Sequence, residues 1–249
     1  MIYVFDIDGT ICFNGKNINS KLIKKIKILE ENNEILFASA RPIRDLIPIV
    51  KSFENNTLIG GNGSIISKDK SIKVIKQIPI KEYKLIKQII YDYNLKFIID
   101  DSFNYSSNVD SNNTIFKQLD PENLAENISS EKIVNPIKII LVDISNEIYS
   151  EVKEYLITNG NNLSICFHEK ENNIDITSKS INKYFTLRNI IGEKPYIAFG
   201  NDINDFELLK YAEQAFYVND NVERNVPHNF KIISASVEAI LKTLESKIN

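Results

Sequence analysis

Several residue types that commonly build functional sites are scarce in this sequence. Its 249 residues include no tryptophan, one methionine, two cysteines and two histidines. Cys12 and Cys166 cannot form a disulfide framework, and their spacing fits no zinc site. These absences indicate that any chemistry depends mainly on carboxylates, lysines and hydroxyls.

The sequence also lacks a long apolar run and a strong excess of charge. No stretch approaches the ~18 apolar residues that a membrane span needs. The first residues, MIYVFDIDGT, lack the basic start and the cleavage site of a signal peptide, so we expect a cytoplasmic protein without a membrane partner. Lysine and arginine number 30, aspartate and glutamate number 33, and the resulting charge of −3 argues against nucleic-acid binding. No obligate protein partner is indicated.

What is present is typical of a globular α/β protein, with 43% hydrophobic residues. At both ends of the chain, short apolar runs alternate with amphipathic stretches, which predicts parallel strands connected by helices. A helix over 42–54 contains Pro48, so a kink or a late start is expected there. The other expected elements are strands at 2–5, 34–38, 57–59, 196–199, 215–218 and 231–233, and helices at 20–32, 182–191, 205–212 and 235–246.

The middle of the chain has a different pattern, in which strands follow one another as well as helices. Expected strands lie at 97–99, 137–144, 163–167 and 174–177, and expected helices at 81–95, 121–129 and 146–158. We therefore predict one α/β core built from residues 1–78 and 179–249. A separate α/β domain, residues 79–178, is inserted into it.

The strongest chemical signal directly follows the first strand. Asp6 and Asp8 flank one residue, and Gly9 and Thr10 follow them. Ligands of open α/β sheets bind beyond the carboxyl ends of strands, and a tight turn at Gly9 can bring both acids into one site. Two carboxylates so close repel each other, which favours a bound cation such as Mg²⁺. The alternative interpretation is an ordinary charged turn.

Four further candidate residues carry weaker signals. Ser39 and the amide of Ala40 follow the second strand and could donate hydrogen bonds to a phosphate, although Ser39 could equally be a helix N-cap. Arg41 could bind substrate or pair with an acid. Lys183 lies near the start of a later helix, where most lysines are solvated.

A second acid-rich loop follows the strand at 196–199. It contains Asn201, Asp202, Asn204 and Asp205, and it lacks the regular oxygen spacing of a calcium loop. Taken alone, it is also consistent with a turn that caps a helix.

Together these segments resemble the haloacid dehalogenase superfamily of phosphatases, class IIB, Cof-like type, over nearly the whole chain. Asp6 to Thr10 matches the family's first motif, Ser39 the second and Lys183 the third, while Gly200 to Asp205 matches the fourth. The stretches at 38–42 and 62–64 also resemble family sequences. The resemblance implies a Rossmann-like parallel-sheet core with an inserted α/β cap of the C2 type.

The resemblance also implies roles for individual residues. Asp6 is the nucleophile, and Asp8 is the general acid and base. Mg²⁺ is held by Asp6, the backbone carbonyl of Asp8 and the fourth-motif loop. The remaining residues hold the phosphate or the substrate: Thr10, Ser39, Ala40, Arg41, Lys183 and Asn204.

One position departs from the family pattern. Asn201 stands where the first aspartate of the fourth motif is usual. The ligand from this loop is therefore Asn201, Asp202 or Asp205, and an amide in place of a carboxylate weakens a metal site. Asp205 could instead anchor Lys183.

The function implied by the resemblance is Mg²⁺-dependent hydrolysis of a small phosphorylated metabolite through an aspartyl-phosphate. The substrate could be a sugar phosphate, pyridoxal phosphate, or a flavin or nucleotide phosphate. A phosphomutase is an alternative, and a weakly catalytic protein that binds phosphorylated ligands is another.

Overall fold

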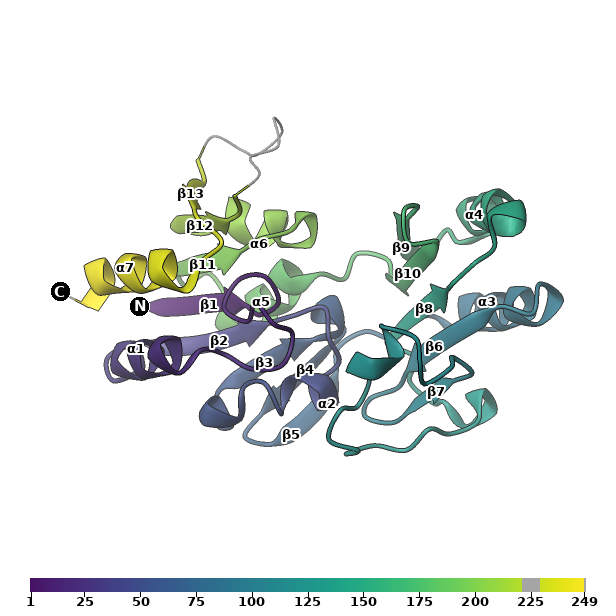
Figure 1. Ribbon diagram of the computed structural model, residues 1–249, viewed down its shortest axis with the longest axis horizontal. Coiled ribbons are helices and arrows are strands. Elements are labelled where there is room, and N and C mark those ends of the chain that lie inside the picture. The colour runs from purple at the N-terminus through teal and green to yellow at the C-terminus, as the bar shows by residue number, and fades with distance from the viewer. Residues whose placement is uncertain (221–228, 249) are drawn as a thin grey trace.

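The computed structural model describes residues 1–220 and 229–248, and its strands form two separate sheets (Figure 1). The first sheet lies in the half of the molecule that contains both termini, and the second lies in the other half. Within the two described ranges, no helix is both long enough and apolar enough to cross a membrane.

The first sheet has eight strands in the order β13-β12-β11-β1-β2-β3-β4-β5. All neighbours from β13 to β3 are parallel, whereas β4 and β5 form an antiparallel extension at the edge. The strands are β1 (Ile2–Asp6), β2 (Glu34–Ala38), β3 (Thr57–Gly60), β4 (Ile65–Lys68), β5 (Ser71–Val74), β11 (Tyr196–Gly200), β12 (Gln214–Val218) and β13 (Lys231–Ile233).

Helices cover both faces of this sheet because side chains of a strand alternate between its faces. Tyr3 and Phe5 of β1 join one apolar cluster with α1, α2 and α7, while Ile2 and Val4 join another with α5 and α6. These helices are α1 (Ser20–Glu30), α2 (Ile43–Leu46), α5 (Lys183–Ile191), α6 (Phe206–Lys210) and α7 (Val237–Ile248).

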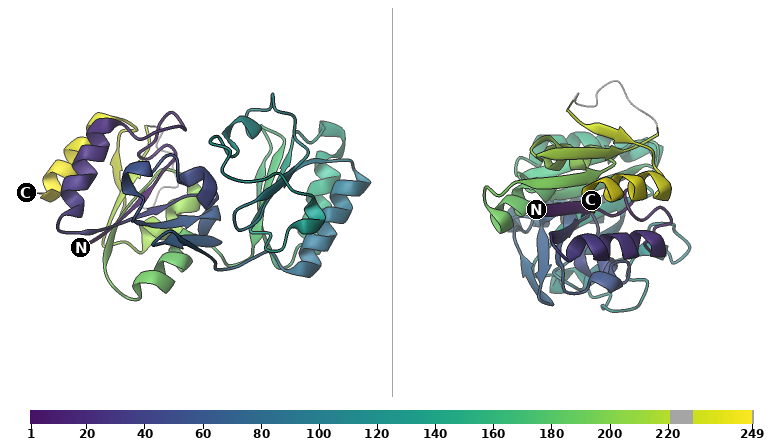
Figure 2. Two further views of the ribbon diagram at one scale, coloured as in Figure 1. Left: turned by 90° about the horizontal axis from the view of Figure 1, so that it is seen from below. Right: turned by 90° about the vertical axis from the view of Figure 1, so that its left-hand side faces the viewer.

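The second sheet has five antiparallel strands in the order β7-β6-β8-β10-β9. Figure 2 shows that its two helices lie on the side away from the first sheet, so the opposite face of the second sheet is turned toward the first. The elements are α3 (Ile80–Asp92), β6 (Lys96–Asp100), β7 (Tyr105–Ser107), β8 (Lys138–Val142), α4 (Asn146–Asn159), β9 (Leu163–His168) and β10 (Asn173–Ser178).

The predicted α/β fold with a parallel sheet is confirmed, but some expected elements are wrong or were missed. No helix occupies 121–129, where the chain forms turns. The helix expected over 42–54 ends at Leu46, before Pro48, which has no N–H to continue it. The hairpin of β4 and β5 was not anticipated.

The two halves of the molecule are connected by a buried arginine. Arg44 of α2 is 1% exposed, and its guanidinium forms an ion pair with Asp100 at the end of β6. It also donates to the carbonyl oxygen of Phe103 (3.0 Å), and Asp45 accepts from the backbone N–H of Asp120 (2.9 Å). The contact between the two halves therefore includes charged groups that are almost entirely removed from water.

We expect Arg44→Met to lower the free energy of unfolding by ~3–5 kcal/mol, because the substitution leaves buried carboxylates without a cation. Urea-induced unfolding measures the loss. Lys70→Met is the control, since Lys70 pairs with Glu54 at the surface (66% and 62% exposed) and should cost less than about 1 kcal/mol. Equal losses in the two variants would contradict the importance of the buried connection.

Candidate active site

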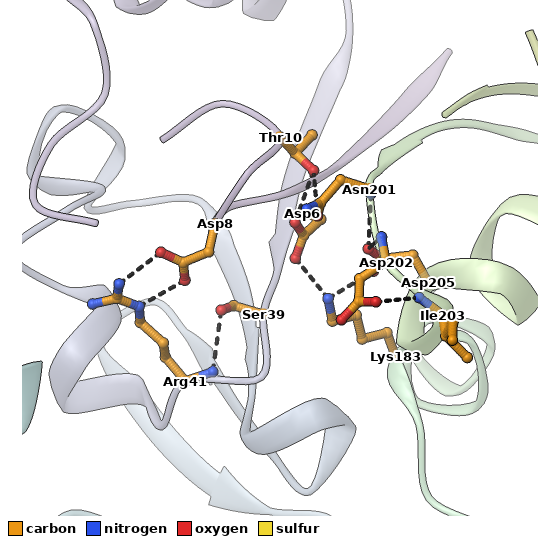
Figure 3. A network of polar contacts seen from close by, with 10 residues as sticks. All are labelled: Asp6, Asp8, Thr10, Ser39, Arg41, Lys183, Asn201, Asp202, Ile203 and Asp205. Atoms are coloured by element: carbon orange, nitrogen blue, oxygen red, sulfur yellow. Dashed lines mark hydrogen bonds and ion pairs between the residues drawn. The ribbon is translucent and has the colours of Figure 1, made fainter. Parts of the chain in front are cut away.

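Asp6 is the last residue of β1 and lies in the middle of the first sheet, between β11 and β2. Its side chain is buried, and its Oδ2 accepts a hydrogen bond from Thr10 Oγ1 (2.8 Å). Its Oδ1 accepts from Lys183 Nζ at 2.6 Å (Figure 3). Burial and the nearby carboxylate of Asp205 raise the pKa of Asp6 to about 7, although Lys183 opposes this shift.

Lys183 is the first residue of α5, and its ammonium group lies between two carboxylates. Its Nζ is 2.6 Å from Asp6 Oδ1 and 2.7 Å from Asp205 Oδ1. Burial by itself lowers the pKa of a lysine, but Asp205 and Asp6 outweigh it and raise the pKa above its usual value. Lys183 is therefore a permanent cation beside Asp6.

Asp205 is fully buried, and both of its oxygens hold neighbouring groups in place. Oδ1 pairs with Lys183, and Oδ2 accepts from the backbone N–H groups of Asn201 (3.1 Å) and Asp202 (3.3 Å). Asp202 is exposed and accepts from the backbone N–H of Ile203 (2.7 Å), so it caps the short helical turn that follows. Of the three candidate metal ligands in this loop, Asp202 and Asp205 therefore use their carboxylates for contacts within the loop and with Lys183.

The side chain of Asn201 is the part of the loop that reaches Asp6. One end of its amide lies 3.0 Å from Asp6 Oδ2, 2.9 Å from the carbonyl oxygen of Asp8 and 3.1 Å from Thr10 Oγ1. The close contact of Asn201 with the first loop requires glycine at position 9. Gly9 has φ +75°, and a Cβ at this position would lie 2.2 Å from the Asn201 side-chain amide. Gly9 thus brings the two acid-rich loops together.

These atoms fit a hard cation. Mg²⁺ binds oxygens at about 2.1 Å in an octahedron, so adjacent ligand oxygens lie about 3.0 Å apart. The separations of the Asn201 amide from Asp6 Oδ2 (3.0 Å) and from the Asp8 carbonyl (2.9 Å) match this edge length. Among the described residues no three histidine, cysteine, aspartate or glutamate side chains group closely enough to hold a metal, so a backbone carbonyl and an amide would have to contribute.

Asp8 points away from Asp6 and is held by Arg41. Arg41 Nε donates to Asp8 Oδ2 (2.7 Å) and Nη2 donates to Oδ1 (2.6 Å), a bidentate pair. Ser39 is buried and its Oγ accepts from the backbone N–H of Arg41 (3.1 Å). Of the two expectations for Arg41, the structure shows the pairing with an acid.

The predicted residues gather around one cavity of about 410 Å³ at the carboxyl ends of the parallel strands. Thr10, Arg41 and Asp205 lie behind its walls and contact residues that form them. Asn204 has a buried Oδ1 without a hydrogen-bond partner among the described residues. The walls are formed by Asp6, Asp8, Gly9, Ser39, Ala40, Lys183, Asn201, Asp202 and Asn204.

The family of haloacid dehalogenase-like hydrolases matches residues 3–240. The chain belongs to this family. Its fold resembles that of a haloacid dehalogenase-like hydrolase from Bacteroides thetaiotaomicron, with 18% identity, a TM-score of 0.83 and coverage of 99% and 98% of the two chains. A Thermotoga maritima protein has 22% identity, a TM-score of 0.82 and coverage of 98% and 96%.

A further structural relative is described as a subclass IIB sugar phosphatase of the same superfamily. It shares 21% identity and a TM-score of 0.78, with coverage of 100% of this chain and 99% of the relative. At such identities the likeness shows a common fold. No match was found among curated protein sequences.

This haloacid dehalogenase-like hydrolase has a second cavity, of about 320 Å³, between its two sheets. Asp8 and Arg41 border it from the first half, and Ile98, Lys138 and Ile140 border it from the second sheet. Sequence analysis did not assign Lys138 or Asp45, which also lines this cavity, to the site. In the sequence, Lys138 and Ile140 alternate with Ile139 and Leu141, which pack against the helices of the second sheet. This alternation was the local signal that Lys138 and Ile140 face the other side of that sheet.

A double-mutant cycle tests the buried ion pair between Lys183 and Asp205. Lys183→Met and Asp205→Asn should each destabilise the protein, but together they should cost ~1–3 kcal/mol less than the sum, because Asp205→Asn removes one of the two buried carboxylates that Lys183→Met leaves without a cation. Urea-induced unfolding provides the four free energies.

The matched control is the exposed pair of Lys96 and Asp110 (43% and 70% exposed). The same cycle, with Lys96→Met and Asp110→Asn, should give a coupling below about 1 kcal/mol. Additive losses at Lys183 and Asp205 would show that the ammonium does not depend on that carboxylate.

Proposed function

We propose that the protein is a Mg²⁺-dependent phosphatase that hydrolyses small phosphorylated metabolites through an aspartyl-phosphate intermediate. The observation that carries the proposal is the convergence of Asp6, Asp8, Ser39 and Lys183 on one cavity at the carboxyl ends of β1 and β2. A carboxylate, a second carboxylate, a hydroxyl and a cation are the groups that attack, protonate and bind a phosphate ester.

Asp6 is the proposed nucleophile. One carboxylate oxygen attacks phosphorus, the bond from phosphorus to the ester oxygen breaks, and the leaving group takes a proton from Asp8. Water then attacks phosphorus and gives a proton to Asp8, the bond from phosphorus to the Asp6 oxygen breaks, and inorganic phosphate leaves with the Asp6 carboxylate restored. Both oxygens of Asp8 accept from Arg41, so Asp8 must exchange one of these hydrogen bonds for the proton that it delivers.

The phosphoryl oxygens are held by donors that surround Asp6. An ammonium group has three donors, and Lys183 uses two of them for Asp6 and Asp205, which leaves one for phosphate. The Ser39 hydroxyl, the Ala40 backbone N–H and the Asn204 amide border the same cavity and supply the remaining donors.

The carboxylate of Asp6, the carbonyl of Asp8 and the amide oxygen of Asn201 are the proposed Mg²⁺ ligands. When bound, Mg²⁺ supplies positive charge that reduces the repulsion between the nucleophile and the phosphate. We favour Asn201 over Asp202 and Asp205 because only its side chain lies beside both Asp6 and the Asp8 carbonyl.

Residues 1–78 and 179–249 are the proposed catalytic core, and residues 79–178 are the proposed cap. The cavity between the sheets, at about 320 Å³, is at the small end of the range for metabolite sites, ~300–1,000 Å³. Its apolar surface, from Ile98 and Ile140, and its polar groups, from Asp45 and Lys138, suit a small leaving group that carries both kinds of surface.

We expect Asp6→Asn to lower phosphatase turnover by about 10³-fold or more, since an amide cannot replace the carboxylate as nucleophile. The measurement is phosphate release from p-nitrophenyl phosphate and from a panel of phosphorylated metabolites. Asp69→Asn, in the exposed turn between β4 and β5, is the control and should retain wild-type turnover. An Asp6→Asn variant within threefold of wild type would sink the assignment.

We also expect EDTA to abolish turnover and added Mg²⁺ to restore it, because the Asp6 carboxylate and the phosphate repel each other without a cation. Phosphate release before chelation, after chelation and after re-addition of Mg²⁺ measures this dependence. Undiminished turnover in EDTA would exclude a catalytic role for the metal.

A further inference from the structure

The amide of Asn201 faces a set of atoms that a carboxylate could not satisfy. Asp6 Oδ2 and the Asp8 carbonyl oxygen, which lie 3.0 Å and 2.9 Å from the amide, are both hydrogen-bond acceptors. Thr10 Oγ1 lies 2.8 Å from Asp6 Oδ2 and 3.1 Å from the Asn201 amide, and its single proton goes to the nearer, charged acceptor, Asp6. An oxygen at this end of Asn201 would therefore face two acceptors, whereas the nitrogen can donate one proton to each.

The same position suits an amide oxygen when a cation is present. Mg²⁺ prefers oxygen ligands. The distances from the Asn201 amide to Asp6 Oδ2 and to the Asp8 carbonyl oxygen match the spacing of about 3.0 Å between adjacent oxygens of an octahedral Mg²⁺ site. A half turn of the amide about its last torsion exchanges nitrogen for oxygen with almost no change of shape. Asn201 can thus present a donor or an acceptor at one place.

We propose that Asn201 is a reversible ligand, whose nitrogen bridges Asp6 and the Asp8 carbonyl in the absence of metal and whose oxygen binds Mg²⁺ after a half turn of the amide. The inference deepens the proposed function and rests on its Mg²⁺ site. Asparagine at this position lets the site satisfy its own acceptors when no cation is bound.

An aspartate at position 201 would behave differently. It has no donor when ionised, so it would face Asp6 and the Asp8 carbonyl as a third acceptor and would add a negative charge near Asp205. Such a site needs a cation to be stable. Compared with aspartate at position 201, asparagine therefore lowers the affinity for Mg²⁺ and stabilises the protein without metal.

The test compares wild type and Asn201→Asp by thermal unfolding in EDTA and in Mg²⁺, without substrate. In EDTA the melting temperature of the variant should fall by about 3 °C or more, since two hydrogen bonds, one of them to a carboxylate, are lost. Mg²⁺ should raise the melting temperature of the variant more than that of wild type. Titration calorimetry with Mg²⁺ alone should show affinity on the order of tenfold tighter in the variant.

Asn55→Asp is the matched control. Asn55 is exposed in the turn before β3, so the substitution adds the same charge at a distance from the site and should change neither melting temperature nor Mg²⁺ affinity. Asn201→Ala removes donor and acceptor together, so it should be destabilised in EDTA and gain little from Mg²⁺.

A variant Asn201→Asp that folds only with Mg²⁺ supports the inference. Melting temperatures of wild type and both Asn201 variants within 1 °C in EDTA would overturn it, as would equal Mg²⁺ affinities of wild type and Asn201→Asp. Neither readout requires catalysis. If the wild type releases no phosphate but the stability pattern is found, the proposed function fails and the reversible ligand remains.

Discussion

The ion pairs of Lys183 with Asp6 and Asp205 are the constraint on which the rest of the site depends. The three residues are at most 4% exposed and belong to β1, α5 and the loop after β11. Removing charges from water is costly unless each is paired, so these segments must meet in one arrangement. The strand order, with β1 directly beside β11, makes that meeting possible. Helix α5 is the first helix after β10, so Lys183 also lies where the chain returns from the second sheet to the first.

Next to these charged residues, three strands of the first sheet carry closely packed aromatic rings. Phe5, one residue before Asp6, lies in register with Phe37 of β2 and Phe199 of β11. Its ring centroid is 4.8 Å from that of Phe199 and 6.2 Å from that of Phe37, and all three rings are fully buried. Close packing of this kind resists small shifts, because a displaced ring loses contacts on every side. The position of the Asp6 carboxylate therefore depends on apolar packing, and Lys183 favours its ionised form.

The sequence predicted what is local and periodic, and failed where contacts are distant. Buried strands that end in polar residues placed Asp6, Ser39 and Asn201 at one edge of the sheet, because parallel strands share that edge. The helix expected over 121–129 does not form. Of its two large apolar residues, Leu124 is 39% exposed and Ile128 alone packs against the apolar cluster of the second sheet, so the segment lacks the apolar stripe that a helix buries. Arg44 and Asp100 are 56 positions apart in the sequence, so no local sequence pattern predicts their contact.

The charge at the site gives a physical reason for an amide at position 201. When Asp6 is ionised, Asp6, Asp205 and Lys183 together carry one negative charge in a buried environment. A carboxylate at 201 would double it, which would strengthen the binding of Mg²⁺ and weaken the attraction of the loaded site for a phosphate dianion. With Asn201, the proposed Mg²⁺ site keeps one net positive charge when the cation is bound. At the proposed Mg²⁺ site, an amide at position 201 would therefore shift binding free energy from the metal to the phosphate.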